Sequence, residues 1–107
     1  MAASQILIID DEPAICEILA TVLTKAGYFV DTAGGTAAGK ARLARGDVDI
    51  ALCDVTMPDG SGIALLRDAH HSGLDTTFVI ITGSSSVATA VEALRAGAQD
   101  YLLKPVN

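Results

Sequence analysis

Short apolar runs recur along the chain and mark its predicted strands. The run at residues 5–10 reads Gln-Ile-Leu-Ile-Ile-Asp, and the run at 49–54 also ends on an aspartate. Continuous apolar runs of this length indicate strands that are buried on both faces of a parallel sheet. With β-branched and aromatic enrichment as a further criterion, the pattern predicts five strands, at residues 5–10, 28–33, 49–54, 77–82 and 100–103.

Between these runs, apolar residues recur at helical spacing. Pro13 stands in the first turn of a segment whose apolar face includes Ile15, Leu19 and Val22, and Gly27 ends that segment. The same signals predict three further helices, over 36–45, from 63 through 69, and over 85–96.

The strict alternation of strands and helices predicts an α/β fold with a doubly wound parallel sheet and right-handed crossovers. Ligands of such sheets bind outside the carboxyl ends of the strands. Residues 55–62, which contain one proline and two glycines, are predicted to be a loop at that edge. We therefore expect the functional groups of this chain at the carboxyl edge of the sheet.

Composition and charge limit the class of protein. The 107 residues are 50% hydrophobic and 19% charged, which predicts one folded domain. The formal charge of −6 would repel a phosphate backbone, so this segment is not expected to bind nucleic acid directly. We expect no membrane span or signal peptide, a cytoplasmic location, and two reduced cysteines.

Polar groups follow the predicted strands and suggest a shared chemistry. The strand ends carry Asp10 and Asp11, Asp54, Thr82, and finally Lys104. Each feature alone is more often a cap, a strand residue or a turn. Close carboxylates repel by about 4 kcal/mol per pair at an effective dielectric of 20, so the cluster needs cations. Lys104 supplies one charge, and Mg²⁺ suits the remaining oxygens. With a phosphate recruited, Asp54 is the central candidate nucleophile.

The joint pattern matches a known family more specifically than any single feature does. It comprises Ile-Leu-Ile-Ile-Asp-Asp-Glu-Pro at 6–13, Asp54 with Met57-Pro58 and Gly62, Ile-Ile-Thr-Gly at 80–83, and the segment 96–105 that ends in Lys-Pro. This pattern resembles the receiver domain of two-component response regulators over essentially the whole chain. The resemblance implies a flavodoxin-like strand order of 2-1-3-4-5.

The same resemblance implies roles for the residues at the strand ends. Asp54 would be the phosphoacceptor, and Asp10 and Asp11 would be the acidic pair that binds Mg²⁺ or Mn²⁺ together with Asp54. Thr82 would be the switch hydroxyl, and Lys104 would pair with the phosphoryl group.

Further positions carry implied roles around the phosphoryl group. The backbone carbonyl of Thr56 would complete the metal shell, and the side chains of Thr56 and Ser84 would flank the phosphoryl group, where Gly83 leaves room. Tyr101 would be the switch aromatic, which turns inward when the Thr82 hydroxyl moves toward the phosphoryl group.

The resemblance implies a phosphoacceptor signalling domain that catalyses its own phosphorylation and dephosphorylation, and no enzyme in the ordinary sense. The donor would be the phosphohistidine of a sensor histidine kinase or a small molecule such as acetyl phosphate. The face formed by the fourth helix and the fifth strand would control a C-terminal output domain or a separate effector, with transcription regulation as the expected output. A homodimer is a further expected partner.

Other classes of protein stay open at this point. A receiver used only for docking or dimerisation would share the fold and leave the pocket idle. A flavodoxin-like flavin binder is suggested by the hydroxyl-rich residues 82–86, although Asp10 and Asp11 would repel a flavin phosphate. An aspartyl-phosphate hydrolase would need a second aspartate two residues after its nucleophile at the end of the first strand.

The end of the sequence departs from the family pattern. The family continues into a fifth helix beside the first, whereas this sequence stops two residues after Pro105. We therefore expect residues 1–107 to be a receiver domain that is truncated before or within its last helix. One face of the sheet should then be partly uncovered.

Overall fold

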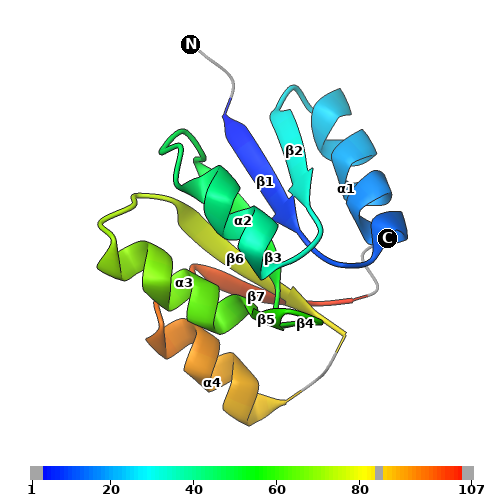
Figure 1. Ribbon diagram of the computed structural model, residues 1–107. Coiled ribbons are helices and arrows are strands. Elements are labelled where there is room, and N and C mark those ends of the chain that lie inside the picture. Colours follow the sequence, from blue (N-terminus) through cyan, green and yellow to red (C-terminus); the bar gives the residue numbers. More distant parts are fainter. Residues whose placement is uncertain (1–3, 84–85, 105–107) are drawn as a thin grey trace.

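The computed structural model describes residues 4–83 and 86–104. Its main sheet has five parallel strands in the spatial order β2-β1-β3-β6-β7 (Figure 1). Their bounds are β1 (Gln5–Ile9), β2 (Phe29–Ala33), β3 (Ile50–Asp54), β6 (Thr77–Thr82) and β7 (Asp100–Leu103). Counted along the chain these are the five predicted strands in the order 2-1-3-4-5, so the predicted fold class is confirmed.

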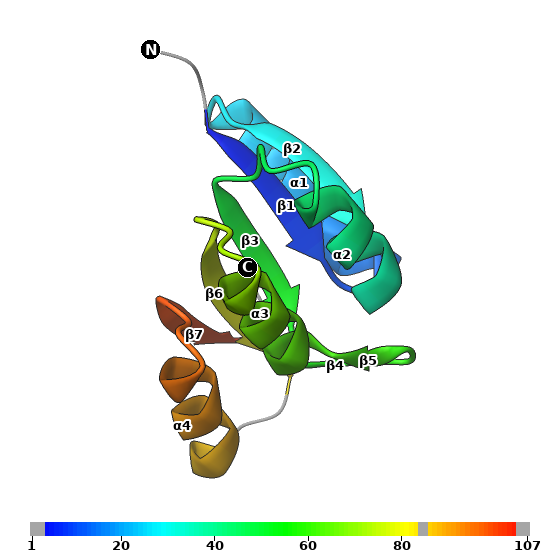
Figure 2. The same cartoon turned by 60° about the vertical axis from the view of Figure 1, so that its left-hand side comes forward.

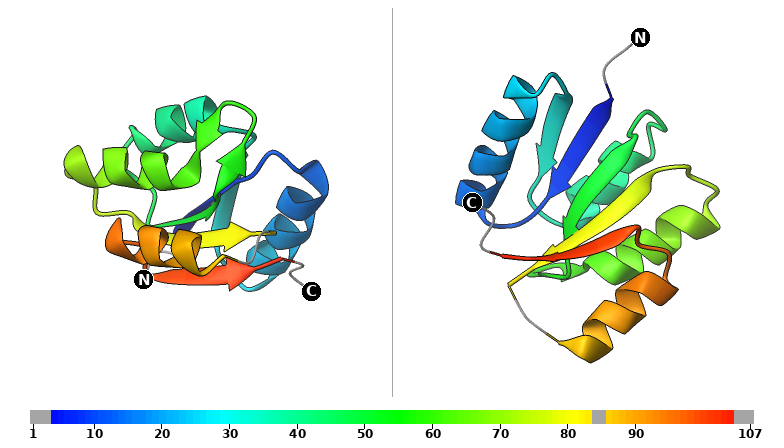
Figure 3. Two further views of the ribbon diagram at one scale, coloured as in Figure 1. Left: turned by 90° about the horizontal axis from the view of Figure 1, so that it is seen from below. Right: turned by 180° about the vertical axis from the view of Figure 1, so that it is seen from behind.

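In the described residues, four helices connect the strands and cover the two faces of the sheet. They are α1 (Pro13–Lys25), α2 (Thr36–Leu43), α3 (Gly62–His71) and α4 (Val87–Arg95). In the left view of Figure 3, α1 lies on one face, and α2, α3 and α4 lie on the other. No helix in the described part of the chain combines the length and the apolar character that a membrane span requires.

Serine caps fix the starts of α3 and α4. The Ser61 hydroxyl oxygen accepts hydrogen bonds from the backbone N–H groups of Ile63 and Ala64, at 3.2 and 3.4 Å. The Ser86 hydroxyl oxygen accepts one from the N–H of Thr89 at 3.3 Å. The hydroxyl satisfies N–H groups that have no partner within the helix. The last helix therefore begins at residue 87, two residues later than the pattern predicted.

The main core lies between the sheet and the helices α2, α3 and α4. Leu7 and Ile9 of β1 and Phe78 and Ile80 of β6 are fully buried there, and Leu66 of α3 packs in the same cluster. These are the alternate positions of strands whose apolar runs are continuous, so both faces of each strand are apolar.

The opposite face is less completely covered. Of the described helices only α1 lies on it, and α1 has no fully buried residue. Ile81 of β6 is buried, but Leu102, its register partner on β7, is 43% exposed. The exposed apolar surface that we expected on one face of the sheet is therefore present at β7.

Residues 55–62, predicted to be an irregular loop, contain a short antiparallel hairpin. The two strands are β4 (Thr56–Met57) and β5 (Gly60–Ser61). Only two residues connect them, and Gly60 adopts φ +152°, a value that favours glycine. Strands of two residues are too short to produce an alternating pattern, which explains why the hairpin was not predicted. Figure 2 shows it projecting from the end of β3 below α2.

The two phenylalanines of the chain give a matched test of the core. Phe78 is 0% exposed, whereas Phe29 on the edge strand β2 is 62% exposed. Phe78→Ala should lower the free energy of unfolding by about 3–5 kcal/mol through lost burial and the cavity left behind. Phe29→Ala should lower it by less than about 1 kcal/mol. Urea denaturation at constant m-value measures both, and equal losses would contradict this description of the core.

Candidate functional site

Two buried carboxylates stand at the carboxyl edge of the sheet, on adjacent strands. Asp10 directly follows β1 and is 1% exposed, and Asp54 is the last residue of β3 and is 6% exposed. The parallel register pairs Ile9 with Cys53, so the two aspartates leave the sheet side by side. Parallel pairing therefore brings together the acids that the sequence placed at two strand ends.

Lys104 completes the site from the other end of the chain. It follows β7, and its backbone N–H donates to the Thr82 carbonyl at 2.8 Å, which holds it beside the end of β6. Its ammonium nitrogen lies 2.9 Å from Asp10 Oδ2, 3.1 Å from Asp54 Oδ2 and 2.6 Å from Glu12 Oε1. One cation is thus shared by three carboxylates, as the clustering of acids required.

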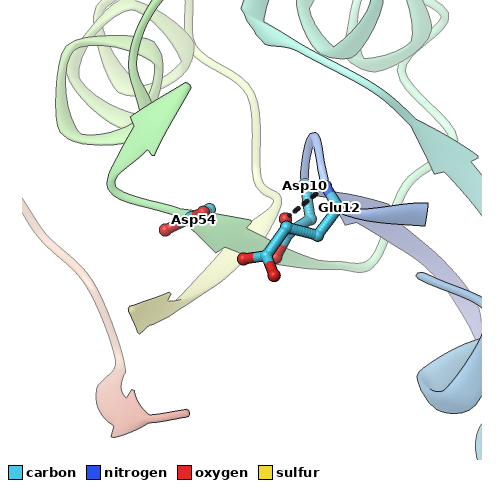
Figure 4. A group of neighbouring side chains, drawn as sticks. All are labelled: Asp10, Glu12 and Asp54. Carbon is cyan, nitrogen blue, oxygen red and sulfur yellow. Dashed lines mark hydrogen bonds between the residues drawn. The ribbon is translucent and has the colours of Figure 1, made fainter. Parts of the chain in front are cut away.

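Glu12 is the member of this cluster that sequence reasoning missed. One carboxylate oxygen from each of Asp10, Glu12 and Asp54 lies within 4.8 Å of the other two. Figure 4 shows Asp10 and Glu12 together after β1, with Asp54 opposite them. The Glu12 N–H donates to Asp10 Oδ1 at 2.9 Å, a turn that aspartate favours and that brings Glu12 back over the site.

Asp11, which the sequence assigned to the acidic pair, lies at the rim of the site. Its side chain is exposed and stays outside the group of Asp10, Glu12 and Asp54. It does line a hollow of about 380 Å³ together with Asp10 and Cys16. Its role as a metal ligand stays a prediction, supported by its place beside Asp10 and by the hollow that the two residues line.

The buried charges of this site affect each other's pKa values. Burial raises the pKa of the Asp54 carboxyl, the hydrogen bond from Lys104 opposes this by a smaller amount, and the charge of Asp10 adds a still smaller rise. Burial alone would lower the pKa of Lys104, but hydrogen bonds to Asp10, Glu12 and Asp54 raise it above its ordinary value. Lys104 therefore stays protonated, whereas ionisation of Asp54 is less favourable than that of an exposed aspartate.

One carboxylate oxygen of Asp10 points into this cluster and faces the shared cation. Asp10 Oδ2 is buried and lies 2.9 Å from the ammonium of Lys104. The same ammonium also serves Glu12 and Asp54, so one cation faces three carboxylates and the cluster keeps an excess of negative charge. The surrounding donor set consists of oxygen atoms, which suits a hard divalent cation such as Mg²⁺. The residues present fit such an ion.

The remaining predicted residues lie around this edge. Thr82 is the last residue of β6 and is buried, and Thr56 begins β4, two positions after Asp54. Among the described residues, a Cβ atom at Gly83 would meet nothing nearer than the Lys104 side chain at 4.0 Å, and the role of Gly83 beside a phosphoryl group stays a prediction.

The two other predicted positions are Tyr101, which the structure describes, and Ser84, which it does not. Tyr101 lies on β7, is half-buried and packs against the main core. Ser84 lies outside the described residues. No observation tests the proposed movement of Tyr101 or the flanking role of Ser84, and both stay predictions.

The start of α3 presses against the backbone of Asp54. The Gly62 N–H donates to the Val55 carbonyl at 2.7 Å, and a Cβ atom at Gly62 would lie 1.9 Å from the Asp54 carbonyl oxygen and 2.8 Å from Cys53 Sγ. No side chain fits there, so glycine is required by the close approach. The contact fixes the backbone on both sides of the phosphoacceptor candidate.

Both cysteines are free, as expected. Cys53 is fully buried, and burial raises the pKa of its thiol to about 12, so it is a neutral core residue. Cys16 is half-buried, and its thiol donates to the Asp10 carbonyl at 3.3 Å.

Comparisons with known proteins agree with this arrangement. Residues 6–107 match the family model described as response regulator receiver domain. The transcriptional regulatory protein ZraR of Salmonella typhimurium is 41% identical over 102 residues, which cover 95% of this chain and 23% of that protein. The chain thus spans about a quarter of the length of this curated relative.

Two solved structures have the same fold. The response regulator receiver domain protein (CheY-like) of Methanospirillum hungatei has a TM-score of 0.92 and 35% identity, and the match covers 98% of this chain and 84% of that one. A response regulator protein from Burkholderia pseudomallei, solved with a phosphorylated aspartic acid, a calcium ion and citrate, has a TM-score of 0.90 and 30% identity. That match covers 97% of this chain and 61% of that chain.

Removing the charge of Asp54 should stabilise the fold at neutral pH. Because its folded-state pKa is raised, ionisation of Asp54 weakens folding as pH rises from the ordinary aspartate value toward the folded one. Asp54→Asn should therefore raise the free energy of unfolding at pH 7. The gain should vanish below about pH 3.9, where the carboxyl is protonated in both states.

Asp68→Asn is the control, since Asp68 is an exposed carboxylate on α3. Urea denaturation across this pH range would measure both variants. A loss of stability in Asp54→Asn at pH 7 would show that the pair with Lys104 outweighs burial.

Proposed function

The chain belongs to the response regulator receiver domain family, and from this premise we propose that Asp54 accepts a phosphoryl group in a metal-dependent reaction. The observation that carries the proposal is the ammonium of Lys104 shared between buried Asp10 and Asp54 at the carboxyl edge of the sheet. The phosphorylated aspartic acid and the ion in the Burkholderia pseudomallei structure support the same chemistry in a relative.

Four groups are proposed to hold Mg²⁺ or Mn²⁺. They are the carboxylates of Asp10, Asp11 and Asp54 and the backbone carbonyl of Thr56. When bound, the metal would supply positive charge to the oxygens of the transferring phosphoryl group. The excess negative charge of the cluster, in which one ammonium faces three carboxylates, supports this assignment, and so does the hollow that Asp10 and Asp11 line together.

In the proposed reaction, an Asp54 carboxylate oxygen forms a bond to phosphorus. The bond from phosphorus to the histidine nitrogen of a kinase, or to the leaving oxygen of acetyl phosphate, breaks, and the leaving group keeps the electron pair. Lys104, 3.1 Å from Asp54 Oδ2, and the Thr82 hydroxyl would contact the phosphoryl oxygens. Thr56 and Ser84 would flank the group and affect attack by water, by which the domain dephosphorylates itself.

The readout of phosphorylation is proposed to lie on the face formed by α4 and β7. Thr82 and Tyr101 would respond to the added charge, and Lys104 ties β7 to the site. Val87 and Leu94 on α4 and Leu103 on β7 are 82%, 53% and 50% exposed, an apolar surface that a partner would cover. The occupant would be a C-terminal output domain, a separate effector or a second copy.

The partner that supplies the phosphoryl group is proposed to be a sensor histidine kinase, which places the reaction in the cytoplasm. The name of the relative ZraR, a transcriptional regulatory protein, favours transcription regulation as the output. A docking module with an idle pocket is the second candidate, favoured by the same exposed apolar side chains of α4 and β7. Phosphorylation of Asp54 distinguishes the two.

Asp54→Asn should abolish covalent labelling by acetyl phosphate in the presence of Mg²⁺, because the amide is a poor nucleophile. Intact-protein mass spectrometry would show one added phosphoryl group on the unaltered chain and none on the variant. Asp68→Asn, which removes an exposed carboxylate from α3, should label normally. An unlabelled wild-type chain would favour the docking module, and equal labelling of Asp54→Asn would place the phosphoryl group elsewhere.

Lys104→Ala should separate metal binding from the response to phosphorylation. The ammonium is not among the proposed metal ligands, so the Mg²⁺ concentration at half-saturation should not rise. The amide chemical shifts of β7 should, however, lose their dependence on the stable phosphoryl mimic beryllofluoride. A heteronuclear NMR titration with Mg²⁺ and then beryllofluoride measures both, and an unchanged β7 response would contradict the assigned role of Lys104.

A further inference from the structure

The tip of the β4–β5 hairpin is bound to the first turn of α2. Asp59 Oδ1 accepts a hydrogen bond from the N–H of Thr36 at 2.8 Å, and Asp59 Oδ2 accepts one from the N–H of Ala37 at 3.1 Å. The Thr36 hydroxyl in turn donates to the Asp59 carbonyl oxygen at 3.2 Å. Three hydrogen bonds thus join two segments that are 23 positions apart.

This contact supplies a cap that α2 lacks locally. The residue before the helix is Gly35, which makes no side-chain cap, so the first N–H groups of α2 depend on another part of the chain. The backbone hydrogen bonds from Thr36 and Ala37 hold the pKa of Asp59 below its ordinary value, so the capping group is a carboxylate. A negative charge at this end also suits the helix dipole.

The fit between the hairpin tip and α2 is close. A Cβ atom on Gly35 would lie 2.8 Å from Asp59 Oδ1, and one on Gly60 would lie 3.1 Å from the Thr36 hydroxyl oxygen. Gly35 has φ −175°, an extended conformation that any residue adopts, so only the proximity of Asp59 disfavours a side chain there. Glycine on each side allows the two backbones to approach.

The other end of the hairpin is part of the phosphorylation site. Thr56, two positions after Asp54, pairs with Ser61, and the next residue, Gly62, contacts the Asp54 carbonyl. The hairpin is therefore fixed at its base by the start of α3 and at its tip by α2 (Figure 2). Without the tip contact, the hairpin would be held by its base and by the buried side chain of Met57, and the Asp59 end of the segment would lose its hydrogen bonds to α2.

We propose that Asp59 is a positioning residue for the phosphorylation of Asp54: by tying the hairpin tip to α2, it holds the backbone of Thr56 where its carbonyl can bind the metal. This inference rests on the proposed function. Asp59 is exposed and lies outside the acid cluster, so its effect on metal affinity would be transmitted through the backbone of the hairpin.

Asp59→Ala should raise the Mg²⁺ concentration at half-saturation about fivefold, which corresponds to roughly 1 kcal/mol, the usual contribution of a helix cap. An NMR titration that follows the amide shifts of Thr56 and Gly62 measures this directly. Asp59→Asn keeps one acceptor oxygen, so its half-saturating Mg²⁺ concentration should lie between those of the wild-type chain and Asp59→Ala. Acetyl phosphate labelling of Asp59→Ala should be slow at low Mg²⁺ and approach the wild-type rate at saturating Mg²⁺.

The matched control is Asp47→Ala, which also removes an exposed carboxylate that contacts α2, in this case through Arg42. It should cost stability and leave the half-saturating Mg²⁺ concentration unchanged. Gly35→Ala, whose methyl group would displace the Asp59 carboxylate, should reproduce the effect of Asp59→Ala with the acid still present.

Two results would overturn the inference, and they are distinguishable. In the first, the wild-type chain is labelled normally, urea denaturation shows that Asp59→Ala is folded, and the variant has the wild-type Mg²⁺ dependence. The positioning role would then be wrong, and the proposed function would stand. If the wild-type chain neither binds Mg²⁺ nor accepts a phosphoryl group, the proposed function fails, and the role of Asp59 fails with it.

Discussion

The carboxyl edge of this sheet depends on the ion pairs that the ammonium of Lys104 forms with three carboxylates. Asp10, Glu12 and Asp54 place carboxylate oxygens within 4.8 Å of one another, and two of these acids are buried. Like charges so close repel strongly at reduced dielectric, and burial adds to the cost of each. Lys104 contacts all three, which lets the acids stay together at this edge of the sheet.

The sequence pattern was sufficient for the sheet and for the acids that end its strands. Buried parallel strands produce continuous apolar runs, and parallel pairing carries Asp10 and Asp54 to one edge whatever the details of the loops. Glu12 could not be placed in this way, because its direction depends on the turn that its N–H makes with Asp10 Oδ1. The order of residue types along the chain predicts which side chains reach this edge of the sheet. It does not predict the direction that a turn gives to a side chain.

The hairpin after β3 was beyond prediction for a different reason. Its strands have two residues each, and its tip is held by a contact between segments far apart in the sequence. Capping rules look for a polar side chain at the residue before a helix, and Gly35 before α2 offers none. The carboxylate that serves α2 comes from Asp59, and only the folded chain shows that the hairpin after Asp54 and this helix are joined by it.

The sharing of Lys104 also bears on the order in which the chain folds. The hydrogen bond from Lys104 to Glu12 joins residues 92 positions apart, so the cation reaches the site only when β7, an edge strand, has paired with β6. Contacts of such long sequence separation form late, because the intervening chain must first be ordered. Until then the acids of β1 and β3 repel one another without compensation. The repulsion should slow the pairing of the two central strands, and millimolar divalent cation in the refolding buffer would take the place of the absent lysine.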